Sequence, residues 1–162
     1  MSLLEWCQWL QHSTLGTGIR GSGYAYPLIE GTHVLGLALS VGTIMWFDLR
    51  LLGLTMRRDA VSSVFNQVRP WMLTGFAVMF ATGTLLFSAR AEEAYSSTYF
   101  RIKAVLLVMG ALNVIIFHTA VDRGREHWDT GRPPFRARMA GLISLILWFG
   151  IIAAGRVMAY KL

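Results

Sequence analysis

The chain has 162 residues, which is room for one domain. Of these residues 54% are hydrophobic and 15% are charged, whereas an average soluble domain has about 25% charged residues. The net charge is +6, but the cations lie in short segments between long apolar runs, which favours a membrane over nucleic acid as the partner. Cys7 is the single cysteine, which excludes an internal disulfide and a four-cysteine metal site.

The first segment of interest, residues 2–12, has apolar side chains at roughly helical spacing and polar side chains opposite them. It is too short to cross a bilayer, so the pattern predicts a helix that lies in the membrane interface. The segment that follows, LGTGIRGSGYAYP, contains four glycines at positions 16, 18, 21 and 23. These glycines predict a loop between the interfacial helix and the first span.

Four apolar runs then follow, and each is about as long as the 20 residues that cross a bilayer core. We place the spans at about 26–47, 71–88, 103–120 and 139–158. Each must be a helix, because an open strand edge in lipid leaves backbone groups unpaired. The sequence therefore predicts an all-α four-helix transmembrane bundle with a short N-terminal interfacial helix, forming a single membrane domain over residues 1–162.

The distribution of the 15 cations predicts the orientation of the bundle. The loops after the first and third spans carry nine of them: Arg50, Arg57, Arg58, Arg69, Arg123, Arg125, Arg132, Arg136 and Arg138. The opposite side carries six: Arg20, Arg90, Arg101, Lys103, Arg156 and Lys161. The positive-inside rule places the two loops in the cytoplasm. Both termini are then periplasmic in a bacterial inner (cytoplasmic) membrane protein.

Small residues in the spans indicate where helices could approach closely. On the first span, Gly36 and Ser40 share a face with Leu37, with Thr43 or Ile44, and with Phe47, and this face is expected to point into the bundle. Gly83 on the second span and Gly110 on the third are expected at helix contacts as well.

Polar side chains inside a span are costly and usually have a partner or a function. His33 in the first span, His118 near the end of the third and Arg156 in the fourth are the main candidates, and Asn113 and Glu30 are two more. His12 and His127 lie outside the spans and are expected at the surface.

Neutral imidazole is a common haem ligand, and bundle interiors can hold haem b. On the periplasmic side, His33 is accompanied by Arg156, Arg101 and Lys103, whose charges suit haem propionates. There are alternatives for each residue. His33 could instead hydrogen-bond across helices, Arg156 could anchor its helix at the interface, and His118 could be a second metal or haem ligand or a solvated helix-end residue.

The depths of the two histidines differ by an estimated ~15 Å, at ~1.5 Å of rise per residue in a core ~30 Å thick. Two ligands of one iron must lie at nearly the same depth. His33 and His118 are therefore not expected to hold one haem together, although two haems are possible. The second axial ligand of His33 could be His12, Lys103, a residue of a neighbouring subunit, or none.

Several segments resemble a family of small bacterial four-helix membrane proteins of unknown function. They are YPLIEGTHVLGLALSVGTIMWFDLRLLG, ATGTLLF, YFRIKAVLLVMGALNVIIFH and SLILWFGIIAAGRVMAY. More distantly, the arrangement is similar to HemJ-type protoporphyrinogen oxidases and CopD-like proteins. The HemJ-type pattern implies a haem-binding histidine at His33, with Lys103 and His118 in matching places on the third span. The additional Asp48 and a longer spacing from lysine to histidine depart from it, so haem binding carries over better than oxidation of protoporphyrinogen.

These observations favour a b-type haem-binding membrane protein that transfers electrons to or from quinone or a partner dehydrogenase, and that could be an oxidoreductase component. Catalytic residues stay unknown. Two alternatives are a cofactor-free structural or assembly subunit of a membrane complex and a CopD-like metal transporter. The expected partner is the lipid bilayer, and quinone, a partner redox protein or a second copy of the chain in a homo-oligomer are further candidates. Nucleic acid is not expected as a partner.

Overall fold

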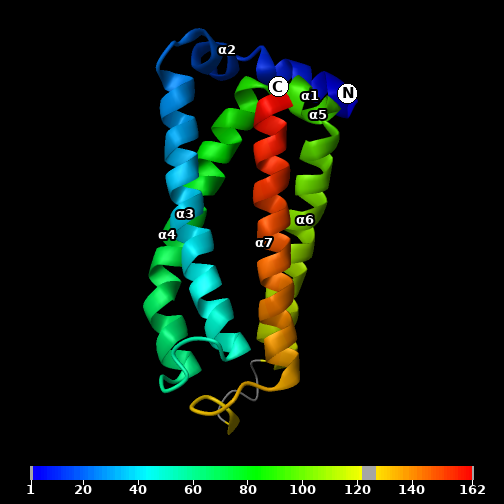
Figure 1. Cartoon of the computed structure of the whole chain (residues 1–162). Coiled ribbons are helices and arrows are strands. Elements are labelled where there is room, and N and C mark those ends of the chain that lie inside the picture. Colours follow the sequence, from blue (N-terminus) through cyan, green and yellow to red (C-terminus); the bar gives the residue numbers. More distant parts are fainter. Residues whose placement is uncertain (1, 122–126, 162) are drawn as a thin grey trace.

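The structure is a computed structural model that describes residues 2–121 and 127–161, with the side chain of Lys161 outside the described part (Figure 1). The expected cations Arg123 and Arg125 also lie outside it. The described residues form helices and no strands. In chain order the helices are α1 (Leu3–Gln11), α2 (Thr14–Gly21), α3 (Ala25–Leu52), α4 (Val61–Ala89), α5 (Ala91–Ser96), α6 (Thr98–Ile116), the π-helical turn η1 (Phe117–Val121) and α7 (Phe135–Lys161).

Four of these helices are long and apolar enough to cross a membrane: α3, α4, α6 with η1, and α7. This confirms the predicted all-α bundle of four spans with a short N-terminal helix. The helices extend beyond the predicted spans at their polar ends; α4, for example, begins at Val61 rather than at Trp71. The apolar runs end where charged residues begin, but arginine and glutamine are good helix formers and do not end a helix.

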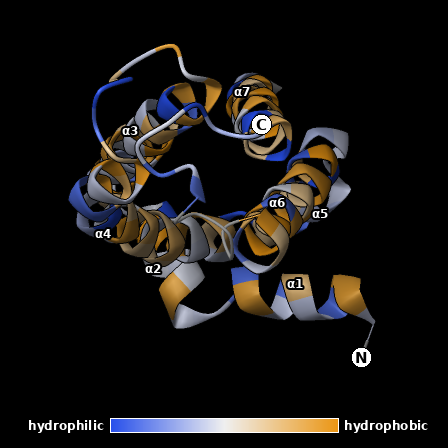
Figure 2. Cartoon of the chain, turned by 90° about the horizontal axis from the view of Figure 1, so that it is seen from below, coloured by the Kyte–Doolittle hydropathy of each residue, from blue (hydrophilic) through white to orange (hydrophobic). Residues whose placement is uncertain are grey.

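The chain ends lie at one end of the bundle, together with α1, α2 and α5, which we call the terminal end (Figure 1). The opposite end, called the loop end, contains residues 53–60 and 127–134. Figure 2 shows α1 lying across the direction of the long helices. Its first turn is closed by a capping box, in which Ser2 and Glu5 each accept a hydrogen bond from the backbone of the other. The helix predicted for residues 2–12 is therefore present.

The loop predicted for residues 15–27 is wrong, because α2 occupies most of it. The side chain of Ser13 caps α2 by accepting a hydrogen bond from Gly16 N. A Cβ at Gly16 would lie only 2.7 Å from the carbonyl oxygens of Gln11 and Ser88. This glycine therefore lets α2 pack against α1 and α4, and tertiary packing outweighs its low helix propensity.

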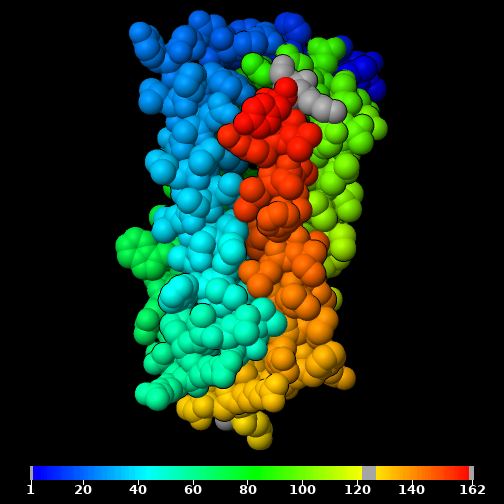
Figure 3. Space-filling view, viewed as in Figure 1, coloured from blue at the N-terminus to red at the C-terminus, as the bar shows by residue number. Residues whose placement is uncertain are grey.

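The four long helices form two closely packed pairs, α3 with α4 and α6 with α7, which are joined along α3 and α7 (Figure 2). Figure 3 shows the side chains of α3 and α7 in contact on one face of the molecule. On the remaining side, the described parts of α4 and α6 make almost no close backbone contact. Ring contacts bridge this side near each end: Phe87 with Phe100 at the terminal end, at 5.4 Å between centroids, and Phe65 with His118 at the loop end, at 5.8 Å.

Small residues set the close approach of α3 and α4, as predicted for Gly36 and Ser40. A Cβ at Gly75 would lie 2.6 Å from Ser40 N and 2.9 Å from Gly36 O, so only glycine fits there. The prediction for Gly110 is wrong: a Cβ at this position would meet no atom within 4 Å. The third span instead meets α7 through Leu106, whose side chain lies 3.1 Å from the Cβ position of Gly150.

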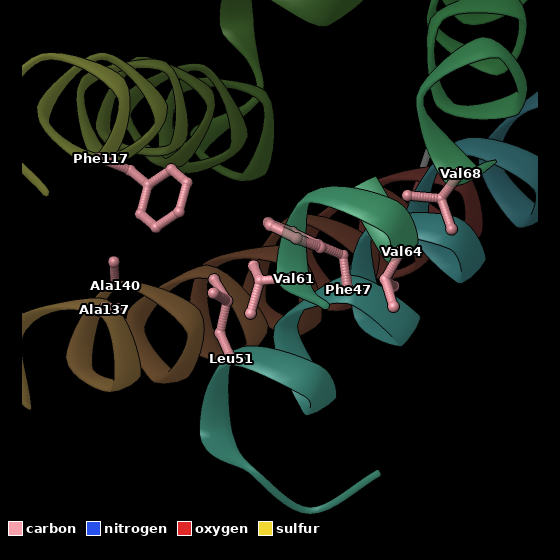
Figure 4. Packing of buried hydrophobic residues seen from close by; sticks show 8 residues of the cluster. All are labelled: Phe47, Leu51, Val61, Val64, Val68, Phe117, Ala137 and Ala140. Atoms are coloured by element: carbon pink, nitrogen blue, oxygen red, sulfur yellow. The ribbon is translucent and has the colours of Figure 1, made fainter. Parts of the chain in front are cut away.

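The apolar core is concentrated in the half of the bundle near the loop end. Figure 4 shows one cluster there, which draws on all four long helices: Phe47, Leu51, Val61, Val64, Val68, Phe117, Ala137 and Ala140. A second cluster of buried residues, Val41, Ile44, Trp148 and Ile151, lies closer to the middle. Helix α6 has no buried residue between Thr98 and Ile116, whereas α3 is the most extensively covered of the four spans.

A network of hydrogen bonds, with the buried Arg50 among its members, joins the segments of the loop end. Asp129 caps the start of α4: its backbone oxygen accepts from Val61 N, and its carboxylate accepts from the backbone and hydroxyl of Ser62. Arg50 at the end of α3 is only 1% exposed and donates to the backbone oxygens of Asp59 and Asp129. The two loops are therefore held together by side chains of α3 and of the loops themselves.

Candidate functional site

His33 lies on α3 in the half of the bundle near the terminal end, where it contacts α4. Its Nδ1 is 2.9 Å from Thr82 Oγ1, and the Thr82 hydroxyl is 2.6 Å from the Val78 carbonyl oxygen. The hydroxyl has one proton and donates it to that carbonyl, so its oxygen can only accept from His33. His33 therefore carries its proton on Nδ1, and its Nε2 has a free lone pair. That is the tautomer of a metal-ligating histidine.

The position of the His33 ring depends on a glycine of α4. A Cβ at Gly83 would lie 3.2 Å from His33 Cε1, which is closer than side chains normally pack. Gly83 was predicted at a helix contact, and the structure confirms this, with the imidazole as its neighbour. His33 is partly buried and also forms a hydrogen bond with the backbone of Met79 on α4.

Lys103 of α6 lies on the side of that helix that faces α7. Its Nζ is 3.6 Å from the position that a Cβ would take at Gly155. Its side chain is partly buried. Of the three cations predicted to accompany His33, Lys103 is the one that the structure places inside the bundle.

The other two predicted cations lie at the terminal end but on its surface. Arg101 is exposed, with its guanidinium 5.6 Å from the centre of the Tyr95 ring and within hydrogen-bonding distance of the Tyr95 carbonyl. Arg156 is also exposed, 5.3 Å from the centre of the Tyr160 ring. Both guanidinium groups therefore lie against an aromatic ring at the surface, as expected of side chains that anchor a helix at the membrane interface. This anchoring role is the alternative that the sequence left open for Arg156. The structure does not bring them to His33.

His118 lies at the other end of the bundle. It is exposed, in η1, and its ring contacts Phe65 near the start of α4. Thr82, the partner of His33, follows Phe65 by 17 positions on the same helix, which is ~25 Å at 1.5 Å per residue. This separation agrees with the prediction that the two histidines do not share one iron. Whether His118 binds a metal of its own stays a prediction.

The remaining polar candidates have ordinary surroundings. Asn113 donates to the Ala140 carbonyl at 3.0 Å and thereby links α6 to α7. Glu30 is partly buried, and His12 and His127 are exposed, as predicted for the two histidines. Within residues 2–121 and 127–161, no group of three or more His, Cys, Asp or Glu side chains is arranged to hold a metal ion.

Asp48 is a buried carboxylate that the sequence marked only as a departure from the HemJ-type pattern. It is 4% exposed and bonds to Ser144 of α7, and its Oδ2 has no hydrogen-bond partner in the described part of the chain. Asp48 lies nearer the loop end than the second apolar cluster, which contains Val41 and Ile44, and is therefore separate from His33.

The residues that sequence reasoning missed are Thr82 and Gly155. A threonine in a span usually bonds the carbonyl four residues earlier, as Thr82 does, so its second role as an acceptor for His33 gave no local signal. Each long helix therefore contributes at least one residue to the site. The residues are His33 on α3, Thr82 and Gly83 on α4, Lys103 on α6 and Gly155 on α7.

Comparison with known proteins gives a family and no activity. No curated protein and no solved structure gives a significant match. Residues 5–161 match a family of unknown function, DUF6644. That match covers most of α1, all four long helices and every residue of the site around His33. The chain therefore belongs to this family of unknown function, as a member with four helices long and apolar enough to cross a membrane.

Proposed function

We propose that this protein binds b-type haem within its membrane bundle and transfers electrons to or from quinone or a partner dehydrogenase. The observation that carries the proposal is the orientation of the His33 ring by Thr82, which places the proton on Nδ1 and the lone pair on Nε2. Metal-ligating histidines commonly have their second nitrogen fixed by such a hydrogen bond. Haem, when bound, would supply one-electron redox chemistry, for which the chain's own side chains have no equivalent.

We expect the surroundings of His33 to suit a flat, partly charged cofactor. Glycines pack against two of the side chains: Gly83 against the His33 ring and Gly155 against Lys103. Both clusters of buried apolar residues lie nearer the loop end than His33 does. The Lys103 ammonium is available to a propionate, which is an anion that would otherwise be costly to bury.

The resemblance to HemJ-type proteins adds support from the sequence, because His33 and Lys103 occupy the corresponding places. The cation distribution supports a bacterial inner membrane location with the loop end in the cytoplasm. In this orientation the haem lies nearer the periplasmic face. A CopD-like transport function has less support, since the eight methionines are scattered rather than clustered as soft ligands.

The proposal is tested by the absorption spectrum of the protein purified from haem-replete cells. The wild-type protein should show a Soret band, and His33→Ala should lose it while the protein still inserts into the membrane. His118→Ala and His127→Ala remove an imidazole from the loop end and should leave the band in place.

Two outcomes would contradict this assignment. A colourless wild-type protein would reject haem binding and favour the cofactor-free subunit of a larger complex. A Soret band that survives in His33→Ala but is lost in His118→Ala would move the haem to the loop end.

A further inference from the structure

A cavity of about 630 Å³ lies at the loop end, between the end of α3, the loop that follows it and the segment that leads into α7. Four of the residues that line it are arginines: Arg50, Arg57, Arg132 and Arg138. None of the described lining residues is acidic. The volume lies within the range of small-molecule sites, roughly 300–1,000 Å³. We call this cavity the arginine pocket.

The charge of Arg50 is buried without a counter-ion in the described structure. Its hydrogen bonds go to the backbone oxygens of Asp59, at 3.0 and 2.8 Å, and Asp129, at 3.4 Å. These oxygens are neutral, and Arg50 also lines the pocket. A buried guanidinium whose acceptors are all neutral is costly, so an anion in the pocket would relieve this cost.

Arg138 contributes an unsatisfied group from the opposite wall. Its Nε is buried and has no hydrogen-bond partner in the part of the chain that the structure describes. None of the four arginines forms an ion pair with a described residue; the recorded pair, Arg90 with Glu93, lies at the terminal end. Orientation by the positive-inside rule needs cations near the surface. The rule therefore does not explain why a buried arginine and a guanidinium nitrogen without a hydrogen-bond partner lie around one cavity.

We propose that the arginine pocket binds a phosphorylated anion. Guanidinium groups pair with phosphate oxygens through two parallel hydrogen bonds, and several of them together favour a doubly charged group. The pocket lies where the spans end, so the phosphoryl group could belong to an anionic lipid headgroup or to a soluble phosphate compound. Because Arg50 also holds the backbones of Asp59 and Asp129, an occupied pocket would brace both loops.

The experiment measures the thermal unfolding midpoint of delipidated protein in an uncharged detergent. One arm adds inorganic phosphate, compared with chloride at the same ionic strength. The second arm adds phosphatidylglycerol, compared with phosphatidylcholine. A saturable rise in the midpoint in the phosphate arm indicates a soluble phosphate compound, and a rise with phosphatidylglycerol alone indicates a lipid headgroup. No rise in either arm overturns the proposal.

Variants then locate the effect. Arg132→Gln and Arg138→Gln should each weaken the apparent affinity by about tenfold or more, the usual effect of losing a charged hydrogen bond. Arg136→Gln is the matched control, because Arg136 is exposed on the first turn of α7 and does not line the pocket. If Arg138→Gln fails to accumulate, the exposed Arg132 provides the comparison. An equal loss of affinity in Arg136→Gln would show only general charge attraction and would reject the pocket.

Discussion

The hydrogen bond between His33 and Thr82 joins two residues that are 49 positions apart in the chain. His33 itself was identifiable from the sequence, because an imidazole inside an apolar run is rare and costly. Its partner was not, since Thr82 looks like any threonine that bonds its own helix. The same is true of Gly155, which is one of sixteen glycines in the chain and has meaning only through Lys103. The type of a residue inside a span thus indicates whether it is a candidate for the site. Which residues pair with one another depends on how the helices pack.

Removing the Thr82 hydroxyl should weaken haem binding without removing the axial ligand. Thr82→Val keeps the size of the side chain, but removes the hydroxyl to which His33 Nδ1 donates. Loss of such an orienting partner lowers metal affinity by about tenfold to a hundredfold. The measurement is the haem content and haem dissociation rate of the purified variant.

Two controls accompany this variant. Thr82→Ser retains the hydroxyl and should retain the haem. Thr84, two positions after Thr82 on the same helix, has an exposed hydroxyl that donates to Phe80 O, and Thr84→Val removes this hydroxyl. Equal haem affinity in Thr82→Val and the wild type would show that Thr82 does not orient the ligand.

At the scale of the elements, the four spans followed from apolar run lengths, but the lengths and neighbours of the helices did not. The third span was expected to use Gly110 as a contact, whereas α6 meets α7 through Leu106 and Asn113. Both faces of a transmembrane helix are apolar, so hydropathy does not distinguish a face that meets lipid from one that meets a neighbour. Helix α2 was missed because glycines usually indicate a loop, and the packing of Gly16 against the backbones of α1 and α4 is not visible in the sequence.

The glycines of α4 and α6 give a matched pair of substitutions. Gly75→Ala places a Cβ 2.6 Å from Ser40 N, and because this neighbour is backbone, α3 and α4 must move apart. The expected loss of stability is about 1–3 kcal/mol, as for other overpacked sites. Gly110→Ala places a Cβ in open space, and should be neutral or stabilising by up to about 1 kcal/mol through helix propensity.

The thermal unfolding midpoints of the two variants in one detergent provide the measurement. Gly75→Ala should unfold at a lower temperature than the wild type, and Gly110→Ala should not. The reverse order would mean that α6, rather than α3, makes the closest backbone contact in the bundle.

For the whole molecule, the even number of spans and the common position of the two chain ends agree with the sequence (Figure 1). The direction of the bundle across the membrane is predicted from the cations alone. Single cysteines can test it in a Cys7→Ser background: Ser96→Cys on α5 at the terminal end, and Ser63→Cys at the loop end. Both serines are exposed.

A membrane-impermeant maleimide should label Ser96→Cys in intact cells, and should label Ser63→Cys only after permeabilisation, because the loop end carries the excess of arginine. Thr17→Cys on α2 is exposed and should react like Ser96→Cys. The opposite pattern would invert the orientation. Different accessibility of Thr17→Cys and Ser96→Cys would contradict the shared terminal end.

The unequal coverage of the helices has a consequence for how the protein is made. Helix α3 is the least apolar of the four spans and the most covered by its neighbours, whereas α6 is the most apolar and the least covered. During synthesis α3 leaves the ribosome first, carrying Glu30 and His33, whose partition into lipid is unfavourable. We expect it to remain beside the translocation channel until α4 arrives, and the two to enter the bilayer as a hairpin. Helix α6 needs no such companion and can partition into lipid by itself.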